Sequence, residues 1–425
     1  MTGLIIFGSL LIGMFMGLPV CFALLAACLI YLIPSGIPLT IVPQTMIADM
    51  NSFVLLAIPL FTMTGYLMEQ TSLSRRLVDF VEALFCRSRG SMGVVTIVTC
   101  AIFAALTGSG PATVAAIGAI MMPALTRANY PKSTSAGMIA AGGALGPIIP
   151  PSANMVVYGA SMGLSVSKMF IGGVLPGIMM AVALCLVNVY LAAKYKFAKS
   201  DVRYPKKEVL RRTARAIPTL VLPVIILGGI YSGFFTPTEA AVVSVFYGLV
   251  VGVFVYREIK LKDLKKIFYE SVLTMATVLL IMSASTIFGW ILAKQQIPQA
   301  LAKAFLGISD SKYVFLLLIN VMLLVVGMVC EAGAAMVILA PLLAPIAQTL
   351  GIDLIHFGII MMTNLAIGMM TPPVGVNLYV VCDSANVKIE GMMKYLMRYF
   401  AVLIADLLII TYFPPLSLLI PTLLK

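Results

Sequence analysis

Charged residues are scarce in this chain of 425 residues. Asp, Glu, Lys and Arg together make up 10% of it, hydrophobic residues make up 61%, and the mean hydropathy is +1.08. Residues 91–126 and 133–167 contain no Asp, Glu, Lys, Arg or His. Because about 20 apolar residues suffice to cross a bilayer, this composition excludes a soluble domain and predicts an all-α, polytopic membrane protein.

Other absences exclude whole classes of chemistry. The chain has one histidine, His356, expected at the membrane interface, and its seven cysteines form no C-x-x-C pair, so neither a metal centre nor a disulfide framework is predicted. No Walker A motif is present, which excludes a P-loop ATPase. The segment GASMG at 159–163 matches the G-x-S-x-G pattern of serine hydrolases, but it lies in an apolar helix with no nearby base. We therefore expect neither an enzyme nor an organic cofactor.

The formal net charge of +12 comes from basic residues that gather in short segments between apolar runs. This distribution is the positive-inside signature of cytoplasmic loops, and it argues against a nucleic-acid partner. The basic segments are 75–89, 194–215 and 257–266.

Placing these segments on the cytoplasmic side organises the chain into two repeats and the spans around them. Residues 1–90 are expected to form N-terminal scaffold spans, at 4–32 and 52–69, joined by an interfacial connector at 43–51. Residues 194–267 are expected to form a basic cytoplasmic connector and two further scaffold spans.

The repeats share one order of elements, namely a re-entrant hairpin, a broken helix and a plain span. An odd number of spans separates the hairpins, which predicts inverted repeats. The first repeat core, 91–193, comprises a hairpin at 91–126, a broken helix at 133–167 and a span at 169–193. The second repeat, 268–425, comprises a span at 268–292, a hairpin at 313–349, a broken helix at 355–382 and a final span at 395–422.

The internal match supports this reading but is imperfect. AIMMPAL (119–125) parallels VILAPLL (337–343), and GPIIPPSAN (146–154) parallels GMMTPPVGVN (368–377). However, Pro123 and Pro150 lie 27 positions apart, whereas Pro341 and Pro372 lie 31 apart. We attribute the difference to loop length.

The breaks carry adjacent prolines, Pro150-Pro151 and Pro372-Pro373. Proline removes a backbone donor and stops the helix, and at membrane depth such a break persists only if it is buried in protein or lines a wet cavity. The freed carbonyl groups can coordinate Na⁺, and the helix N-terminus beyond the break can face an anion. One isolated proline would indicate only a kink, but paired breaks in inverted halves favour an ion and substrate site.

The side chains near the breaks are hydroxyls and amides, which suit Na⁺ better than a transition metal. For any one of them, helix capping remains an equal alternative. Two acids lie within apolar runs: Glu331 at the second hairpin tip, and Glu239, for which a helix-capping role after Thr236 is the stronger alternative. The hydroxyl and amide residues are Thr107, Ser109, Thr113, Ser152, Asn154, Thr371 and Asn377.

Four motifs in order, GSGPATVAAIGAIMMPAL, GALGPIIPPSANMVVYG, FTPTEAAVVSVFYGLV and MTPPVGVNLYV, resemble the large membrane subunit of tripartite ATP-independent periplasmic (TRAP) transporters, in the ion-transporter superfamily. The resemblance spans essentially the whole chain. It implies sodium-driven symport of a small organic anion, a C4-dicarboxylate or a sugar acid such as sialic acid, across the bacterial inner membrane by an elevator movement of a transport core against a scaffold.

The resemblance also implies partners: a periplasmic substrate-binding protein and a small four-helix membrane subunit, expected as a separate chain because this one has no room for it. The alternatives are a stand-alone Na⁺/carboxylate transporter of the same superfamily and, more remotely, a channel or an intramembrane enzyme.

By the same resemblance, each hairpin tip and the nearby break form one Na⁺ site. The first set is Thr107, Gly108, Ser109, Thr113, Pro150, Ser152 and Asn154; the second is Gly327, Gly333, Gly368 and Thr371, with Asn377 beside it. Because the core has almost no Lys or Arg, the substrate anion should meet helix N-termini, bound Na⁺ and the side chains of Ser152, Asn154, Thr371 and Asn377. The structural or gating residues are Pro151, Pro372, Pro373, Glu239 and Glu331.

Overall fold

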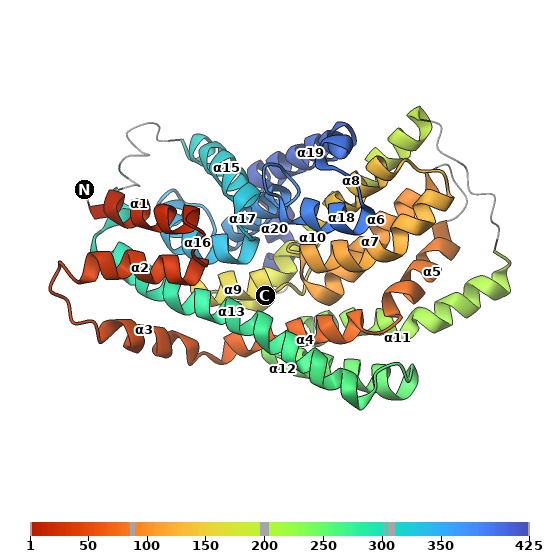
Figure 1. The fold of residues 1–425 in the computed structure, drawn as a ribbon, viewed down its shortest axis with the longest axis horizontal. Helices are drawn as coiled ribbons and strands as arrows, with labels where there is room; N and C mark the ends of the chain where they lie inside the picture. Colours follow the sequence, from red (N-terminus) through yellow and green to blue (C-terminus); the bar gives the residue numbers. More distant parts are fainter. Residues whose placement is uncertain (1, 86–89, 196–203, 301–302, 304–310, 424–425) are drawn as a thin grey trace.

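Helices form all regular elements in the part of the chain that this computed structural model describes (Figure 1). Six of them are long and apolar enough to cross a membrane, and the number reaches eight if each of two bent helix pairs counts as one span. The expected all-α, multi-spanning fold is therefore confirmed. The structure describes residues 2–85, 90–195, 204–300, 303 and 311–423. Residues 86–89 and 196–203, which belong to two of the basic segments, lie outside these ranges.

The N-terminal apolar run is two helices, so the single span expected at 4–32 is wrong. Helix α1 (Thr2–Phe15) packs against α2 (Val20–Leu32). The chain turns between them at Gly17, whose φ of +83° lies in the left-handed region, and Pro19 starts the second helix. Each helix has fewer than 15 residues, about two-thirds of what a perpendicular span needs.

The following segment is bent and then amphipathic. The connector expected at the interface forms α3 (Ile41–Met50), which is joined at an angle of 66° to the unit made of η1 (Phe53–Leu56) and α4 (Ala57–Glu69). Helix α5 (Leu73–Phe85) buries Leu73, Leu77 and Val81 and carries charged side chains on its other face. This pattern is typical of a helix that lies at a membrane surface.

The first repeat contains the expected hairpin and broken helix. Gly108, with φ +62°, and the extended Ser109 separate the two hairpin arms, and residues 144–152 interrupt the following helix. The elements are α6 (Ser91–Thr107), α7 (Gly110–Arg127), α8 (Lys132–Gly143), α9 (Ala153–Ser161) and α10 (Val166–Lys194).

The second repeat has the same order, with one correction at its end. The final span expected at 395–422 stops at Tyr412, where Pro414 prevents continuation, and α20 leaves at an angle of 53°. The elements are α15 (Lys312–Val329), α16 (Ala332–Thr349), α17 (Leu354–Gly368), α18 (Val376–Ala385), α19 (Ile389–Tyr412) and α20 (Pro415–Leu423).

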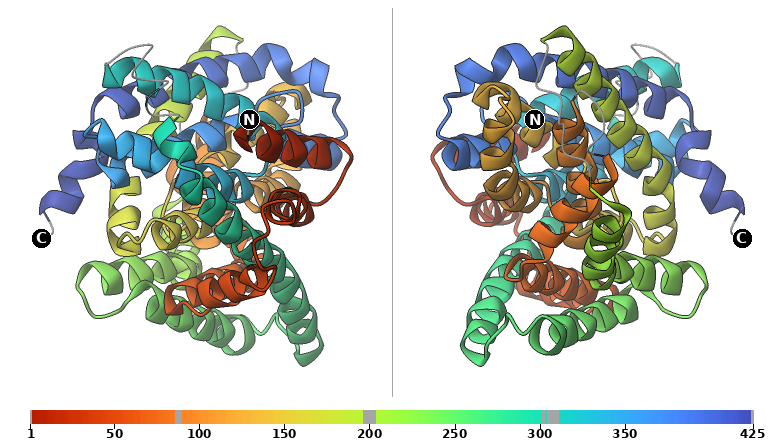
Figure 2. Two further views of the ribbon diagram at one scale, coloured as in Figure 1. Left: turned by 90° about the vertical axis from the view of Figure 1, so that its left-hand side faces the viewer. Right: turned by 90° about the vertical axis from the view of Figure 1, so that its right-hand side faces the viewer.

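The two hairpin units are joined by α11 (Lys206–Tyr231), α12 (Pro237–Val250), the π-helical η2 (Val251–Val255) and α13 (Leu261–Lys294), of which α13 contains the span expected at 268–292 as the first of the second repeat. Helix α4 packs against both α12 and α13. Figures 1 and 2 show α12 along one side of the molecule and α19 on the opposite side, with the hairpins and broken helices between them.

The helix boundaries correct the alignment of the two repeats. Helix α7 begins at 110 and ends at 127, and adding 222 to each number gives the bounds of α16, 332 and 349. Pro123 therefore corresponds to Pro345 and not to Pro341, and Pro345 lies 27 positions before Pro372, as Pro123 does before Pro150. The apparent loop-length difference came from matching prolines one helical turn apart.

The repeats are inverted and pack crosswise. Figure 1 shows the α6–α7 hairpin at one end of the long axis and α15–α16 at the other. Helix α7 packs on α18 and α16 packs on α9, so the second arm of each hairpin contacts the broken helix of the other repeat. If an internal two-fold axis relates the repeats, a contact of α7 with α18 must be matched by a contact of α16 with α9, and both contacts are present.

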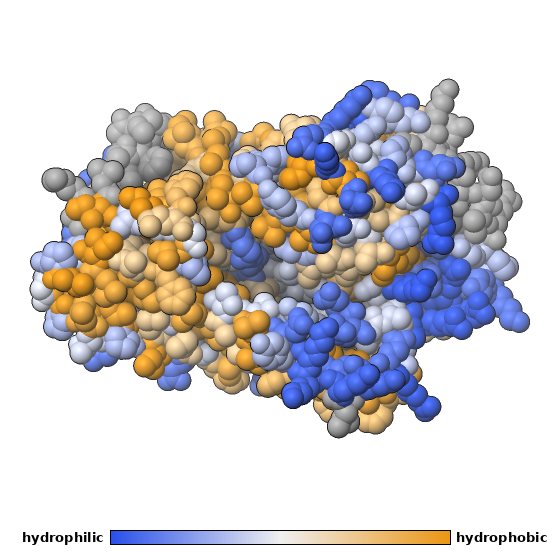
Figure 3. Space-filling model, viewed as in Figure 1, coloured by the Kyte–Doolittle hydropathy of each residue, from blue (hydrophilic) through white to orange (hydrophobic). Residues whose placement is uncertain are grey.

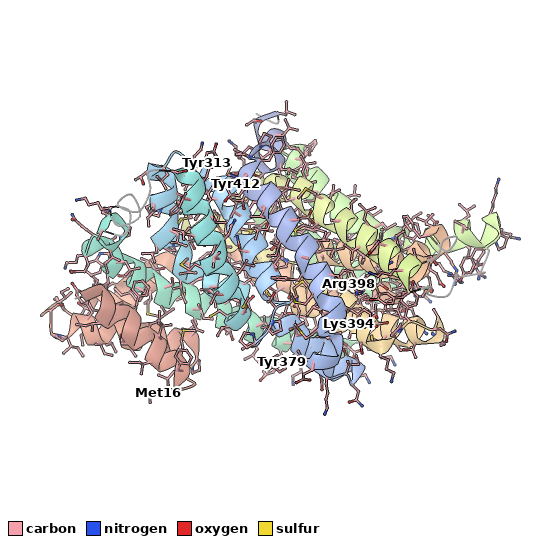
Figure 4. All side chains as sticks on the ribbon, turned by 90° about the horizontal axis from the view of Figure 1, so that it is seen from above. Met16, Tyr313, Tyr379, Lys394, Arg398 and Tyr412 are labelled. Atoms are coloured by element: carbon pink, nitrogen blue, oxygen red, sulfur yellow. The ribbon has the colours of Figure 1, made fainter. Side chains whose placement is uncertain are left out.

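The ends of α19 agree with the expected orientation. Figure 4 shows Tyr412 near Tyr313 at one end of this helix, and Lys394 and Arg398 towards the other. The Tyr412 hydroxyl donates to the Tyr313 carbonyl at 3.2 Å. Basic side chains favour the cytoplasmic side, so the prediction that α15 starts outside stays compatible with this arrangement.

Candidate functional site

The first hairpin tip lies directly on the break of its own repeat. A Cβ atom at Gly108 would stand 2.8 Å from the Pro151 carbonyl oxygen, and one at Gly146 would stand 2.4 Å from the amide nitrogen of Gly110. Real Cβ atoms do not approach so closely, so only glycine permits this contact of backbone with backbone. The tip and the break thus form one continuous surface of main-chain polar groups.

The second tip and the second break meet in the same way. A Cβ atom at Gly368 would stand 2.5 Å from the Gly327 Cα atom, and the Gly375 amide donates to the Met328 carbonyl at 2.9 Å. Gly146 and Gly368 are 222 positions apart, so they hold equivalent places in the two repeats. In both repeats, therefore, this position of the break has no room for a side chain larger than that of glycine.

The breaks leave main-chain oxygens without partners. Each contains a cis X-Pro bond, at Pro150-Pro151 and Pro372-Pro373. Among the described residues, no hydrogen bond reaches the carbonyl groups of 148–151 or 371–374. Short turns close around them: the Ile149 amide donates to the Leu145 carbonyl at 2.9 Å, and the Asn377 amide donates to the Met369 carbonyl at 3.0 Å. These oxygens are available as ligands for a hard cation.

Buried side-chain atoms at the same place also lack partners. Ser152 and Asn377 are both fully buried, and neither the Ser152 Oγ nor the Asn377 Oδ1 and Nδ2 atoms have a hydrogen-bond partner in the described protein. A buried polar atom without a partner costs about 1–3 kcal/mol. Three such atoms gather at the two breaks, beside the carbonyl groups without partners, which makes this place a candidate binding site.

The structure exchanges the two asparagines between the sites. A Cβ atom at Gly110, in the first tip, would lie 3.1 Å from the Asn377 Oδ1 atom, and one at Gly333, in the second tip, would lie 3.0 Å from the Asn154 Oδ1 atom. The sequence grouped Asn154 with the first tip and Asn377 with the second, and in the structure each amide lies beside the tip of the other repeat. The reason is the crosswise packing of α7 on α18 and α16 on α9, which no local sequence pattern reveals.

The hydroxyl groups of the first tip form a small cluster. The Thr113 hydroxyl donates to the Ser109 carbonyl at 2.7 Å and lies 3.3 Å from the Thr107 hydroxyl. Ser109 and Ser152 stand at the N-cap positions of α7 and α9, but neither side chain makes the capping hydrogen bond. Capping, the alternative considered for these residues, does not use their hydroxyls.

The remaining candidates have local roles. The Thr371 hydroxyl donates to the Ile367 carbonyl at 2.7 Å. Glu331 caps α16 by accepting from the Ala334 amide at 3.1 Å, and Glu239 completes a capping box with Thr236 at an exposed helix start. These bonds support the helix-capping alternative for Glu239.

His356 is buried within the protein, and the prediction that it lies at the depth of the membrane interface stays a prediction. Its Nδ1 atom is 2.6 Å from the Ser417 hydroxyl oxygen and its Nε2 atom is 3.2 Å from the Thr411 carbonyl oxygen. The ring therefore ties α17 to the bend between α19 and α20.

Sequence reasoning overlooked two glycines, Gly110 and Gly146. They lie in GSGP and GGALGP, two runs in which glycine precedes proline. Both runs read as turn formers, and a glycine that a turn already explains gives no separate signal that another backbone lies against it.

Two inverted repeats, each with a re-entrant hairpin on a broken helix that exposes main-chain oxygens, define the class of the protein as a membrane transporter. A family model described as "Tripartite ATP-independent periplasmic transporter, DctM component" matches residues 7–416, and the chain belongs to this family. This membership places it among transporter permeases and not among enzymes.

Relatives in the family are named for several substrates. The chain is 43% identical to the isethionate TRAP transporter permease protein DctMQ of Oleidesulfovibrio alaskensis, over 96% of its own length and 65% of that protein. It is 41% identical to the C4-dicarboxylate TRAP transporter large permease protein DctM of Pseudomonas aeruginosa, over 87% of its length and 86% of the relative. It is 36% identical to the sialic acid TRAP transporter large permease protein SiaM of Vibrio cholerae, over 96% of each chain.

Proposed function

We propose that this chain carries a small organic anion into the cell with Na⁺ as the coupling ion. The observation that carries the proposal is the set of unpartnered, fully buried polar atoms of Ser152 and Asn377 beside carbonyl groups that accept no hydrogen bond. Hydroxyl, amide and carbonyl oxygens are the ligands that hard cations prefer. Burial without a partner would otherwise only destabilise the protein.

The proposed Na⁺ ligands follow the two tips. The first site takes hydroxyl and carbonyl oxygens of residues 107–113 with Pro150 and Ser152, and Asn377 closes it from the other repeat. The second takes main-chain oxygens near Gly327, Gly333 and Gly368 with Thr371, and Asn154 closes it. Each site thus draws on both halves of the chain.

The substrate would lie between the sites. The N-termini of α9 and α18 follow the two breaks, and helix N-termini attract anions. The relatives are named for isethionate, C4-dicarboxylates and sialic acid, which are organic anions. We propose an anion of this kind, bound with help from Ser152, Asn154, Thr371 and Asn377.

Net inward movement of positive charge would drive the uptake. Each elementary charge gains about 2.3 kcal/mol per 100 mV, and about 1.4 kcal/mol corresponds to a tenfold concentration ratio. We propose that the repeats move as an elevator core against α4 and α11–α13 in the bacterial inner membrane. The partners would be a periplasmic substrate-binding protein and a separate small membrane subunit.

A sodium titration tests the ion sites without knowledge of the substrate. Thermal stability of the purified protein in detergent is measured against NaCl, with KCl holding the ionic strength constant. A ligand that binds only the folded state raises stability in a saturable way. Ser152→Ala should remove the part of this rise that comes from the first site, whereas Ser161→Ala, which alters a serine at the end of the same helix, should keep the whole rise. Equal stabilities in Na⁺ and K⁺, for the wild type, would count against the sodium sites.

Uptake into proteoliposomes then tests the proposed partners. Uptake that requires an added binding protein supports the tripartite mechanism. Uptake by this chain alone would instead favour a stand-alone Na⁺/carboxylate transporter.

A further inference from the structure

A basic cavity lies outside the transport repeats, between α5 and the first turns of α11. Its volume is about 520 Å³. It is lined by Ser72, Arg75, Arg76, Asp79, Glu208, Arg211, Arg212 and Arg215. Five of these eight side chains are guanidinium groups, opposed by two carboxylates of the lining.

Two of the arginines are not neutralised by ion pairs. Arg76 pairs with Glu258 at 2.8 Å, and Arg211 and Arg212 both pair with Glu208. Arg75 and Arg215 have no carboxylate within 4.0 Å in the described ranges. The cavity therefore presents two available guanidinium groups to a ligand.

The walls are held by further contacts. Glu258 accepts hydrogen bonds from the Ser72 amide at 2.7 Å and the Ser72 hydroxyl at 2.6 Å, while the Arg76 guanidinium stacks on the Tyr256 ring at 3.6 Å. Arg212 donates to the Glu82 carboxylate and to the Asp79 carbonyl, each at 3.2 Å. A cavity fixed in this way loses little entropy when it binds a ligand.

The helices around the cavity are typical of a membrane surface. Helix α5 is amphipathic, and α11 passes from basic residues into an apolar segment after Arg215. The four residues that α11 gives to the cavity, Glu208, Arg211, Arg212 and Arg215, share one face of that helix, and its apolar segment begins directly after them. Figure 3 shows hydrophilic residues gathered on the side of the molecule where Figure 1 places α5 and the start of α11.

We propose that this cavity binds the phosphate group of an anionic phospholipid in the cytoplasmic leaflet, with Arg75 and Arg215 as its main partners. Guanidinium groups bind phosphate oxygens in bidentate fashion, and basic pockets on the cytoplasmic side of membrane helices suit anionic headgroups. The amphipathic α5 and the apolar segment that begins after Arg215 place these guanidinium groups at a membrane surface, where lipid headgroups are concentrated, and this favours a lipid over a soluble phosphate. The site is independent of the proposed sodium sites and of their occupancy.

Lipid binding to the full-length protein tests the proposal. The protein in detergent is titrated with dioleoylphosphatidylglycerol, and retained lipid is counted by native mass spectrometry, with dioleoylphosphatidylcholine as the reference. Removing both charges, in Arg75→Ala with Arg215→Ala, should weaken phosphatidylglycerol binding roughly thirtyfold, because each basic residue near an anionic surface contributes about 1 kcal/mol. The matched control is Lys262→Ala with Lys265→Ala, which removes two charges outside the cavity and should change binding little.

Three outcomes would overturn the proposal: equal binding of the two lipids by the wild type, equal losses in the arginine and lysine variants, or competition by inorganic phosphate at the concentrations effective for the lipid. The last would indicate a soluble phosphate ligand. If the alanine variant does not fold, Arg75→Gln with Arg215→Gln keeps most of the side-chain length without the charge and should show the same loss.

Discussion

Gly146→Ala should separate the first hairpin tip from its break. The added methyl group would stand 2.4 Å from the Gly110 amide nitrogen, 2.5 Å from the Ser109 carbonyl carbon and 2.7 Å from the Ser109 oxygen. All three are main-chain atoms, so no side-chain rotation relieves the overlap. Overpacking of a well-packed interior costs about 1–3 kcal/mol, and we expect the upper end of that range because the backbone must move.

Thermal unfolding in detergent measures this cost, and Gly228→Ala provides the control. Gly228 lies inside α11, and no atom lies within 4 Å of the place that an added methyl group would take, so alanine there should be neutral or stabilise by up to about 1 kcal/mol. We expect Gly146→Ala to lower the melting temperature clearly and to weaken any Na⁺-dependent rise. A Gly146→Ala protein with the stability and sodium response of the wild type would refute the close contact between tip and break.

Two further predictions concern the scaffold. Burial opposes ionisation of Glu258, but the hydrogen bonds from Ser72 and the ion pair with Arg76 outweigh it and hold the pKa below its ordinary value of 4.5. The contribution of the ionised Glu258 to the free energy of unfolding is therefore complete above pH 4.5 and is lost as pH falls below that value. Glu258→Gln should lower the free energy of unfolding by about 1–2 kcal/mol at pH 7 and should flatten the acid limb of a plot of melting temperature against pH. An unchanged plot would contradict this prediction. Thr236→Ala removes the capping box of α12 and should cost about 1 kcal/mol in thermal unfolding, whereas Thr236→Ser should retain most of the stability.

The hairpins and breaks could be predicted from the sequence because their signals are local. Adjacent prolines stop a helix wherever they occur, and a glycine-rich turn inside a long uncharged run requires the chain to reverse within the membrane. The division of the first apolar run was also predictable in principle, since Gly17 and Pro19 form a turn signal that length and hydropathy alone obscure.

The composition of each site could not be predicted in this way. Asn154 is eight positions from Gly146, yet its amide lies against Gly333, which is 179 positions further along the chain. That contact follows from how α16 packs on α9, and the packing of one repeat on another is a tertiary property with no local signature. Similarly, the choice between Pro341 and Pro345 as the partner of Pro123 needed the helix boundaries, because both lie in similar apolar surroundings.

The corrected alignment shows that the two tips are equivalent in backbone but not in chemistry. Gly146 and Gly368 correspond at an offset of 222, so Gly368→Ala, whose methyl group would stand 2.5 Å from the Gly327 Cα atom, should destabilise the protein as Gly146→Ala does. At the same offset, however, Ser109 corresponds to Glu331, and only Glu331 uses its side chain for capping. The first tip therefore leaves the Ser109 hydroxyl uncommitted to capping, while the second places a carboxylate close to Asn154. Two sites of this kind should bind a cation with different affinities, and a sodium titration that resolves two saturable phases, of which Ser152→Ala removes one, is the result expected from that asymmetry.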